Sequence, residues 1–278
     1  MVLPKTLKEA LKGKLTKKER EQLVISFDVV GDIAIIEIPA ELEKKEKLIA
    51  EILLKMHKNI KVVCKKAGGH IGVFRLQKFR ILAGERRKDT EYKESGVRMK
   101  LHIEKTYFSP RFGTERLRIA KQIKAGESVL IMFSGAAPFC LVIAKNAKPN
   151  VVYGIEINPN AHKYALENVK LNKFEDKIKL YKGDVRLVVP TLNKNFDRIA
   201  MPLPKGGENF LDVALSVIKK GGIIHFYDFL HVDEFDLAKQ KVRDACLLAK
   251  KKCKILRLVK CGQQKPRVYR ICVDFKVY

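Results

Sequence analysis

The sequence contains no C-x-x-C pair among its six cysteines, which are Cys64, Cys140, Cys246, Cys253, Cys261 and Cys272. Neither a zinc site nor a disulfide framework is therefore indicated, and a reducing compartment fits. Several of these cysteines lie in apolar, strand-like runs, where cysteine behaves as a small hydrophobic residue. The chain also lacks an apolar run of transmembrane length and an N-terminal signal-peptide core. These absences predict a cytoplasmic protein with no metal and no membrane partner.

Acidic residues are few compared with basic ones. The 278 residues include 31 Asp and Glu against 57 Lys and Arg, and the formal net charge is +26. So large an excess predicts a polyanionic partner, with nucleic acid as the default. A thermophile surface would raise Lys and Glu together, and here Glu does not keep pace. A lysine bias of the whole proteome remains an open alternative.

The stretch from Ser128 to Asp184 has the pattern of a βαβαβ unit, around which the rest of the chain is organised. It contains an apolar run at 129–133, a small-residue turn at 134–137, a helical segment at 138–146, a second apolar run at 151–157 and a third strand at 178–181. Short buried strands that alternate with helices imply a parallel sheet. Ligands of such sheets bind beyond the carboxyl ends of the strands.

The turn after the first strand has one glycine, Gly135, and lacks the G-x-G-x-x-G pattern of a pyrophosphate-binding loop. Small residues let a ligand approach the backbone, and the next helix presents free N–H groups. Glu156 follows by 21 residues, about where an acid meets ribose hydroxyls in nucleotide-binding units. Asp184, at the third strand tip, is placed to reach an adenine edge. We expect a nucleoside ligand without phosphates, such as S-adenosylmethionine (AdoMet), although a glycine turn with a downstream acid also arises by chance.

The N-terminal third predicts a small α+β domain. Its expected elements are one short amphipathic helix between Pro4 and Leu23, two strand-like runs at 25–38 around the turn Val30-Gly31-Asp32, a helix from Glu41 to about His57, and a strand at 60–64. The segment from Lys61 to Lys88 holds nine Lys and Arg and one acid. Its Phe74 and Phe79 could stack on bases. An alternating strand at 73–76 with both phenylalanines in the core is the preferred interpretation.

The remaining chain predicts a larger domain that begins near residue 105. A strand at 97–107 spans this boundary, and a helix at 117–123 follows it. Seven candidate strands come next, at 129–133, 151–157, 178–184, 197–203, 222–228, 254–260 and 269–277. The last two have no helix between them, which suggests an antiparallel addition to a parallel sheet.

Several motifs together resemble the archaeal and eukaryotic tRNA (guanine-37-N1) methyltransferases. They are YFSPRFGTER at 107–116, MFSGAAPF at 132–139, GIEINPNA at 154–161, NVKLN at 168–172 and GDVR at 183–186. FDVVGDIA at 27–34 and LAGE at 82–85 look like the family's middle domain. The resemblance covers nearly the whole chain, and the wybutosine aminocarboxypropyl transferases share most of it. It implies a class I AdoMet-dependent methyltransferase, with a Rossmann-like seven-stranded sheet and a smaller N-terminal α+β RNA-binding domain.

The resemblance also implies roles for single residues. Glu115 would be the general base near N1 of guanine, and Arg75 would steady the guanine and the transition state. The cofactor pocket would contain Tyr107, Ser109, Arg116, Phe133, Gly135, Glu156, Ile157, Asp184, Val185 and Pro204, and the substrate would meet Arg111, Pro202 and Lys205. The partner would be tRNA, bound at its anticodon stem-loop by a monomer. Taken singly, Glu115 could instead be the first-turn acid of a helix, and Tyr107 a strand aromatic.

Two departures from the family pattern stand out. The family has Asn-Leu-Pro or Asn-Pro-Pro after the fourth strand, whereas MPLP at 201–204 puts Pro202 at the position of the Asn. Proline has no polar side chain and no N–H, so the positioning of the base is in question. The second departure is one of length: many members carry an extra N-terminal domain, and we expect this chain to begin in the middle domain, as compact members do. Two alternatives stay open, an aminocarboxypropyl transferase and an RNA-binding relative that has lost catalysis.

Overall fold

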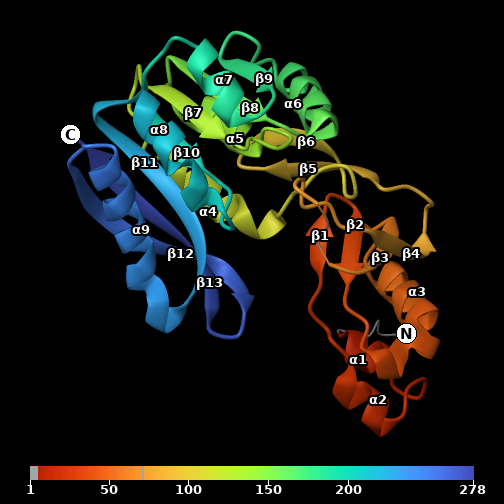
Figure 1. Ribbon diagram of the computed structural model, residues 1–278. Coiled ribbons are helices and arrows are strands. Elements are labelled where there is room, and N and C mark those ends of the chain that lie inside the picture. The colour runs from red at the N-terminus through yellow and green to blue at the C-terminus, as the bar shows by residue number, and fades with distance from the viewer. Residues whose placement is uncertain (1–5, 70–71) are drawn as a thin grey trace. The chain divides into compact units, whose positions relative to one another are not determined.

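The structure is a computed structural model that describes residues 6–69 and 72–278, and it divides into two compact units (Figure 1). The first unit comprises the described residues up to Lys93 together with Lys100–Pro110, and the second comprises Glu94–Met99 with Arg111–Tyr278. The boundary predicted near residue 105 falls in the last segment of the first unit. Among the described helices, none has the length and apolar character needed to cross a bilayer.

The first unit contains a four-stranded sheet of β1 (Asp28–Val30), β2 (Ile33–Ile36), β3 (Val62–Lys66) and β4 (Phe79–Gly84) in that order. β1 and β2 form the hairpin predicted around Gly31. β2 and β3 are parallel, and a 3-10 turn, η1 (Ala40–Lys45), followed by α3 (Glu46–Met56), connects them. Ile49 and Leu53 of α3 are buried against the sheet in the unit's apolar core. The helix predicted from Glu41 to His57 is thus a 3-10 turn and an α-helix in succession.

Two expectations for the first unit are wrong. Between Pro4, which lies outside the described residues, and Leu23 the structure has two short helices, α1 (Leu7–Ala10) and α2 (Lys17–Gln22), and not one. Gly13 between them has a φ of 81°, which interrupts a helix, and Thr16 starts the second one with a capping box.

The strand predicted at 73–76 is the other error, because residues 73–75 lie in a turn and only Leu76 makes an isolated bridge. Gly72 and Arg75 have φ values of 66° and 51°, which a strand does not accommodate, and Val73 is 81% exposed. The core placement of Phe79 is confirmed, since it begins β4 and is buried, whereas Phe74 is only half-buried.

The second unit is built on a seven-stranded sheet with the order β12-β13-β11-β10-β7-β8-β9. All seven predicted strands are present: β7 (Ser128–Met132), β8 (Val151–Glu156), β9 (Ile178–Lys182), β10 (Phe196–Met201), β11 (Ile218–His231), β12 (Cys253–Lys265) and β13 (Val268–Val277). The five strands from β11 to β9 are parallel, and β13 is antiparallel to both β11 and β12. The predicted antiparallel addition is therefore confirmed.

Helices follow the strands along the chain (Figure 1). They are α4 (Gly113–Ala120), α5 (Pro138–Asn146), α6 (Pro159–Leu171), α7 (Val185–Thr191), α8 (Leu211–Val217) and α9 (Phe235–Leu248), with 3-10 turns η2 (Pro110–Phe112), η3 (Gly207–Phe210) and η4 (Val232–Glu234). The apolar core joins α7, α8 and α9 to one face of the sheet. The helix predicted at 117–123 is α4, which begins and ends earlier and packs against α5.

Alternation along the strands puts charged residues on the opposite face. Ile224 and Phe226 of β11, and Val273 and Phe275 of β13, belong to the apolar core. Because successive strand residues point to opposite faces, His225 lies on the other side of the sheet. The buried Arg198 of β10 and Asp274 of β13 stay out of the apolar core in the same way.

A hairpin of β5 (Asp89–Glu94) and β6 (Val97–His102) precedes α4. Ser95 and Gly96 at its turn have φ values of 45° and 79°, as a two-residue type I′ turn requires. Within the second unit, Nδ2 of Asn146 on α5 donates to the carbonyl oxygen of Ser95 at 2.9 Å. The strand expected at 97–107 is shorter than predicted, because it ends at His102 and a turn follows.

Candidate active site at the carboxyl edge of the sheet

The carboxyl ends of the adjacent strands β7, β8 and β9 are tied together by backbone hydrogen bonds. The N–H of Ser134 donates to the carbonyl oxygen of Ile155 at 2.8 Å, and the N–H of Gly183 donates to that of Glu156 at 2.9 Å. The chain order reverses between β7 and β10, which are neighbours in the sheet. Open α/β sheets bind ligands at such a reversal, beyond the carboxyl ends.

The turn after β7 has an unusual backbone. Phe133, Gly135 and Ala137 have φ values of 59°, 59° and 67°. Positive φ is uncommon outside glycine and costs free energy, so the surrounding structure must hold it. Nδ2 of Asn168 on α6 does so by donating to the carbonyl oxygen of Ala136 at 3.2 Å. The predicted small-residue turn is thus a rigid loop at the N-terminus of α5.

Glu156 ends β8 and faces this turn. Its Oε2 accepts from the N–H of Gly135 at 2.7 Å, and its Oε1 accepts from the N–H of Asn158 at 2.7 Å. Burial raises the pKa of Glu156, and the backbone N–H groups partly oppose that rise. A carboxylate has about four acceptor sites, so further donors can still bind here. The structure therefore brings Gly135 and Glu156 into direct contact.

Close packing beneath the turn requires a glycine in β8. A Cβ at Gly154 would lie 2.7 Å from Cδ2 of Leu180, 3.0 Å from Sγ of Cys140 and 3.1 Å from Oγ of Ser134. The Ser134 hydroxyl is buried, and it has no hydrogen-bond partner within the described residues.

Asp184 begins α7, and its Oδ1 accepts from the N–H of Arg186 at 2.8 Å as the helix N-cap. Of its predicted companions, Val185 is buried in the apolar core, whereas Ile157 is 43% exposed after β8. The ring of Phe133 lies 5.0 Å from that of Phe210, edge to face. The edge thus combines apolar surface with carboxylates, as a nucleoside ligand requires.

The loop after β10 contains the predicted substrate positions. The N–H of Leu203 donates to the carbonyl oxygen of Met201 at 2.7 Å, so the chain makes a tight turn around Pro202. Pro202 is half-buried, Pro204 is buried and Lys205 is exposed. Pro202 follows the last paired residue of β10, where a proline is tolerated in a sheet.

Glu115 is buried in the first turn of α4, and three donors face its carboxylate. Nε of Arg118 donates to Oε2 at 2.6 Å, Nη2 of Arg118 donates to Oε1 at 2.7 Å, and the Tyr227 hydroxyl donates to Oε1 at 2.7 Å. The Cys261 thiol is a fourth group beside this carboxylate, which is therefore surrounded by protein groups. The rings of Phe112, Phe139 and Tyr227 contact one another at 5.3–6.2 Å, which connects this region to the first turn of α5.

The other predicted residues have varied surroundings. Arg116 is buried and donates through Nε and Nη2 to the carboxylate of Glu94. Arg111 is exposed on the same unit. The remaining three, Arg75, Tyr107 and Ser109, belong to the first unit.

Sequence reasoning missed a buried charge network on the face covered by α4. Asp274 accepts from Arg118, Arg257 and His225, and these contacts are 2.5–3.2 Å long. Burial raises the pKa of Asp274, but the hydrogen bonds from His225 and Arg118 outweigh it and hold the pKa well below its ordinary value. The signal in the sequence is a charged residue inside an apolar strand, as in Val273-Asp274-Phe275.

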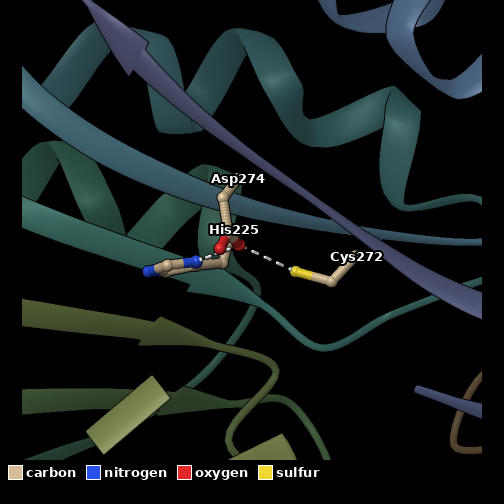
Figure 2. A group of neighbouring side chains, drawn as sticks. All are labelled: His225, Cys272 and Asp274. Atoms are coloured by element: carbon tan, nitrogen blue, oxygen red, sulfur yellow. Dashed lines mark hydrogen bonds and ion pairs between the residues drawn. The ribbon is translucent and has the colours of Figure 1, made fainter. Parts of the chain in front are cut away.

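The group His225, Cys272 and Asp274 has the composition of a metal site (Figure 2). Its donor atoms are nonetheless engaged. Nδ1 of His225 lies 2.5 Å from Oδ1 of Asp274, and Sγ of Cys272 lies 3.2 Å from the same oxygen. Arg118 and Arg257 also donate to Asp274, and a cation would lie beside these guanidinium groups. The cluster is therefore an ion-pair network and not a metal centre.

The mostly parallel seven-stranded sheet, the glycine turn and the acids at successive strand ends define a class I AdoMet-dependent transferase. The chain belongs to the family described as the TRM5/TYW2 methyltransferase domain, whose model matches residues 90–256. The TYW2 N-terminal domain matches residues 7–87.

Relatives from both branches of the family are similar to the chain. The tRNA (guanine(37)-N(1))-methyltransferase Trm5b of Pyrococcus abyssi is 39% identical over 93% of the chain and 76% of the relative. The tRNA(Phe) (4-demethylwyosine(37)-C(7)) aminocarboxypropyltransferase of Pyrococcus horikoshii is 30% identical over 98% of each. A solved complex of aTrm5 and tRNALeu matches with a TM-score of 0.87 and 35% identity, and the match covers the whole chain and 80% of that protein.

Proposed function

We propose that the protein transfers the methyl group of AdoMet to N1 of guanine 37 in tRNA. Two facts about the chain combine to support this: the hydrogen bond between Gly135 and Glu156 at the carboxyl edge, and the 38–39% identity to two archaeal Trm5b enzymes. The net charge of +26 is consistent with a polyanionic substrate.

The residues at the carboxyl edge fit AdoMet. Glu156 keeps open acceptor sites for ribose hydroxyls, and Gly135 leaves the backbone open to a ligand. The edge formed by Asp184 and Ile157 supplies polar and apolar contacts. When bound, AdoMet supplies a sulfonium-activated methyl group, so the chain mainly has to align the reacting atoms.

The protein's chemical task is the removal of the proton on guanine N1. Glu115 accepts this proton, and Arg118 and Tyr227 hold its carboxylate in place. Arg75 of the first unit offsets negative charge that develops on the base. The base must leave the anticodon-loop stack to be modified. Pro202 contributes shape at the strand end and no hydrogen bond.

A tRNA transcript with guanine at position 37 tests this function. Incubation of the protein with the transcript and AdoMet, followed by nucleoside mass spectrometry, should give 1-methylguanosine at position 37. A matched transcript with adenine at position 37 should stay unmodified. A product at another position, or none at any salt concentration, would contradict the proposal.

A second candidate function is aminocarboxypropyl transfer to 4-demethylwyosine at the same nucleotide. Two observations favour it: the match of residues 7–87 to the TYW2 N-terminal domain, and the 98% coverage of the aminocarboxypropyltransferase relative. The two reactions differ in which carbon beside sulfur faces the nucleophile. The same assay with tRNA that carries 4-demethylwyosine separates them, because the added masses differ.

A further inference from the structure

Glu115 is held by a guanidinium that is itself anchored to the sheet. Arg118 donates to both oxygens of Glu115, and its Nη1 and Nη2 donate to Oδ2 and Oδ1 of Asp274 at 2.6 and 3.2 Å. An ion pair between residues three apart on an exposed helix is mobile and contributes little to stability. Here the fully buried carboxylate of Asp274 on β13 forms a second ion pair with the same guanidinium and holds it in place.

Asp274 is oriented in turn by His225. Nη1 of Arg198 lies 3.0 Å from Nε2 of His225, and a guanidinium can only donate, so Nε2 accepts and the ring proton is on Nδ1. Nδ1 then donates to Asp274. Burial lowers the pKa of His225, which agrees with a neutral ring. Glu127 accepts from Arg198 at 2.7 and 3.0 Å, so the contacts run without a break from Glu127 to Glu115.

We propose that Arg118 is a positioning residue: anchored by Asp274, its planar guanidinium fixes the plane of the Glu115 carboxylate in the orientation needed for proton transfer from the base. This inference rests on the proposed function, in which Glu115 takes the proton. A guanidinium presents its N–H groups as a rigid fork, which orients a carboxylate as a single ammonium group cannot. Proton transfer depends on that orientation because the acceptor must lie within hydrogen-bond reach.

The groups that face Glu115 come from four elements. They are Arg118 on α4, the Tyr227 hydroxyl on β11, and the thiols of Cys261 on β12 and Cys272 on β13. Burial raises the pKa of Tyr227 and of both thiols, so these three groups are neutral at ordinary pH. Among these four groups, Arg118 therefore supplies the positive charge. Replacements of Arg118 that keep or remove this charge can separate its effect on the orientation of Glu115 from its electrostatic effect.

The test uses single-turnover methyl transfer to the guanine-37 transcript at saturating AdoMet and tRNA. Arg118→Lys keeps the charge and loses the fork, so the rate should fall about ten- to a hundredfold, the scale of a misaligned reacting group. The acidic limb of its pH–rate profile should stay in place. Arg118→Gln also removes the charge, so that limb should move to higher pH. Arg243→Lys makes the same exchange on the exposed surface of α9, outside the network, and should keep the wild-type rate.

A double variant decides whether Arg118 acts through Glu115. In the Glu115→Gln background, Arg118→Lys should change the rate by less than about twofold, because the group it positions is already lost. Rates that multiply in the double variant, or a wild-type rate for Arg118→Lys beside a slow Glu115→Gln, would overturn the positioning role and leave the proposed function intact. A wild-type rate for Glu115→Gln would instead remove the base itself. Melting temperatures measured in parallel identify any variant that fails to fold.

Discussion

The backbone N–H of Gly135 donates to Oε2 of Glu156 at 2.7 Å, so the turn after one strand is hydrogen-bonded to the acid that ends the next. Glu156 thus has two jobs, because it fixes the turn and keeps acceptor sites open for a ligand. Its Oε1 accepts from the N–H of Asn158, the N-cap residue of α6, and so fixes the start of that helix as well. The loss of this carboxylate should therefore affect both the shape of the site and its affinity for AdoMet.

Glu156→Ala should weaken AdoMet binding by roughly 1–3 kcal/mol, since ribose hydroxyls lose their partner in a partly buried site. Isothermal titration calorimetry measures this difference. The affinity of the wild type for AdoMet should also fall at acid pH. Because burial raises the pKa of Glu156, its carboxylate is protonated at pH values where an ordinary glutamate, with a pKa of 4.5, is still ionised. Glu167→Ala on the exposed side of α6 is a suitable control. Unchanged affinity in Glu156→Ala would exclude the residue from the site.

Much of the second unit could be predicted because its strands are short apolar runs separated by turns. The spacing between Gly135 and Glu156 also indicated their proximity, since both follow adjacent parallel strands. The first unit was harder. The alternation at 73–76 resembles a strand, but positive φ at Gly72 and Arg75 turns the chain, and no periodicity reports that.

The buried network could not be predicted from local pattern. Glu115 and Asp274 are far apart in sequence. The strand register brings the network together, because it places both His225 of β11 and Arg257 of β12 opposite Asp274 of β13. A single charge within an apolar strand was the available signal, but it does not name a partner. Local pattern also does not show how the basic segment 61–88 is paired. There, Lys65, Arg80 and Arg87 form ion pairs with acids of the first unit.

Affinity for tRNA should depend steeply on salt, because phosphate contacts release counterions. The segments predicted to form much of the tRNA-binding surface are 61–88 and 250–270. Lys254 and Lys265 are exposed, and Lys254→Ala or Lys265→Ala should each reduce the slope of log affinity against log salt by about 1. Filter binding across a salt series measures this slope. Lys239→Ala, at a lysine paired with Asp236, should leave it unchanged, and a flat series for the wild type would contradict the electrostatic mode.

Glu115→Gln should slow methyl transfer by about 10²–10⁴-fold, the usual scale for loss of a general base. AdoMet affinity should stay near the wild-type value. The new amide would present an N–H to Arg118 or Tyr227, so folding must be checked in parallel by thermal unfolding. Asp228→Asn removes another buried carboxylate, which pairs with Lys241, and serves as the matched control with little change in rate. Equal single-turnover rates for wild type and Glu115→Gln across pH would rule out the role.

The free energy of unfolding should fall as pH decreases from 7 toward 5. His225 is buried, and burial lowers its pKa from the ordinary value of 6.5, so below that value the unfolded chain binds a proton that the folded chain does not. One such proton contributes a slope of up to about 1.4 kcal/mol per pH unit. His225→Asn keeps a donor to Asp274 but does not titrate. Urea unfolding at several pH values should show a shallower slope for this variant, and identical slopes would refute the assignment.

Pro202 should be a functional adjustment and not the mark of a dead site. The turn at Met201–Leu203 shows that the strand end accepts proline, and Pro204 remains buried beside it. What this chain lacks is one amide side chain able to bond the base edge. Pro202→Asn adds at most about one hydrogen bond to the base, which contributes roughly 0.5–1.5 kcal/mol. The methylation rate should therefore change by no more than about tenfold. An inactive wild type that Pro202→Asn restores would instead identify a degenerate RNA-binding relative. An aminocarboxypropyl product from the wild type would assign Pro202 to that chemistry.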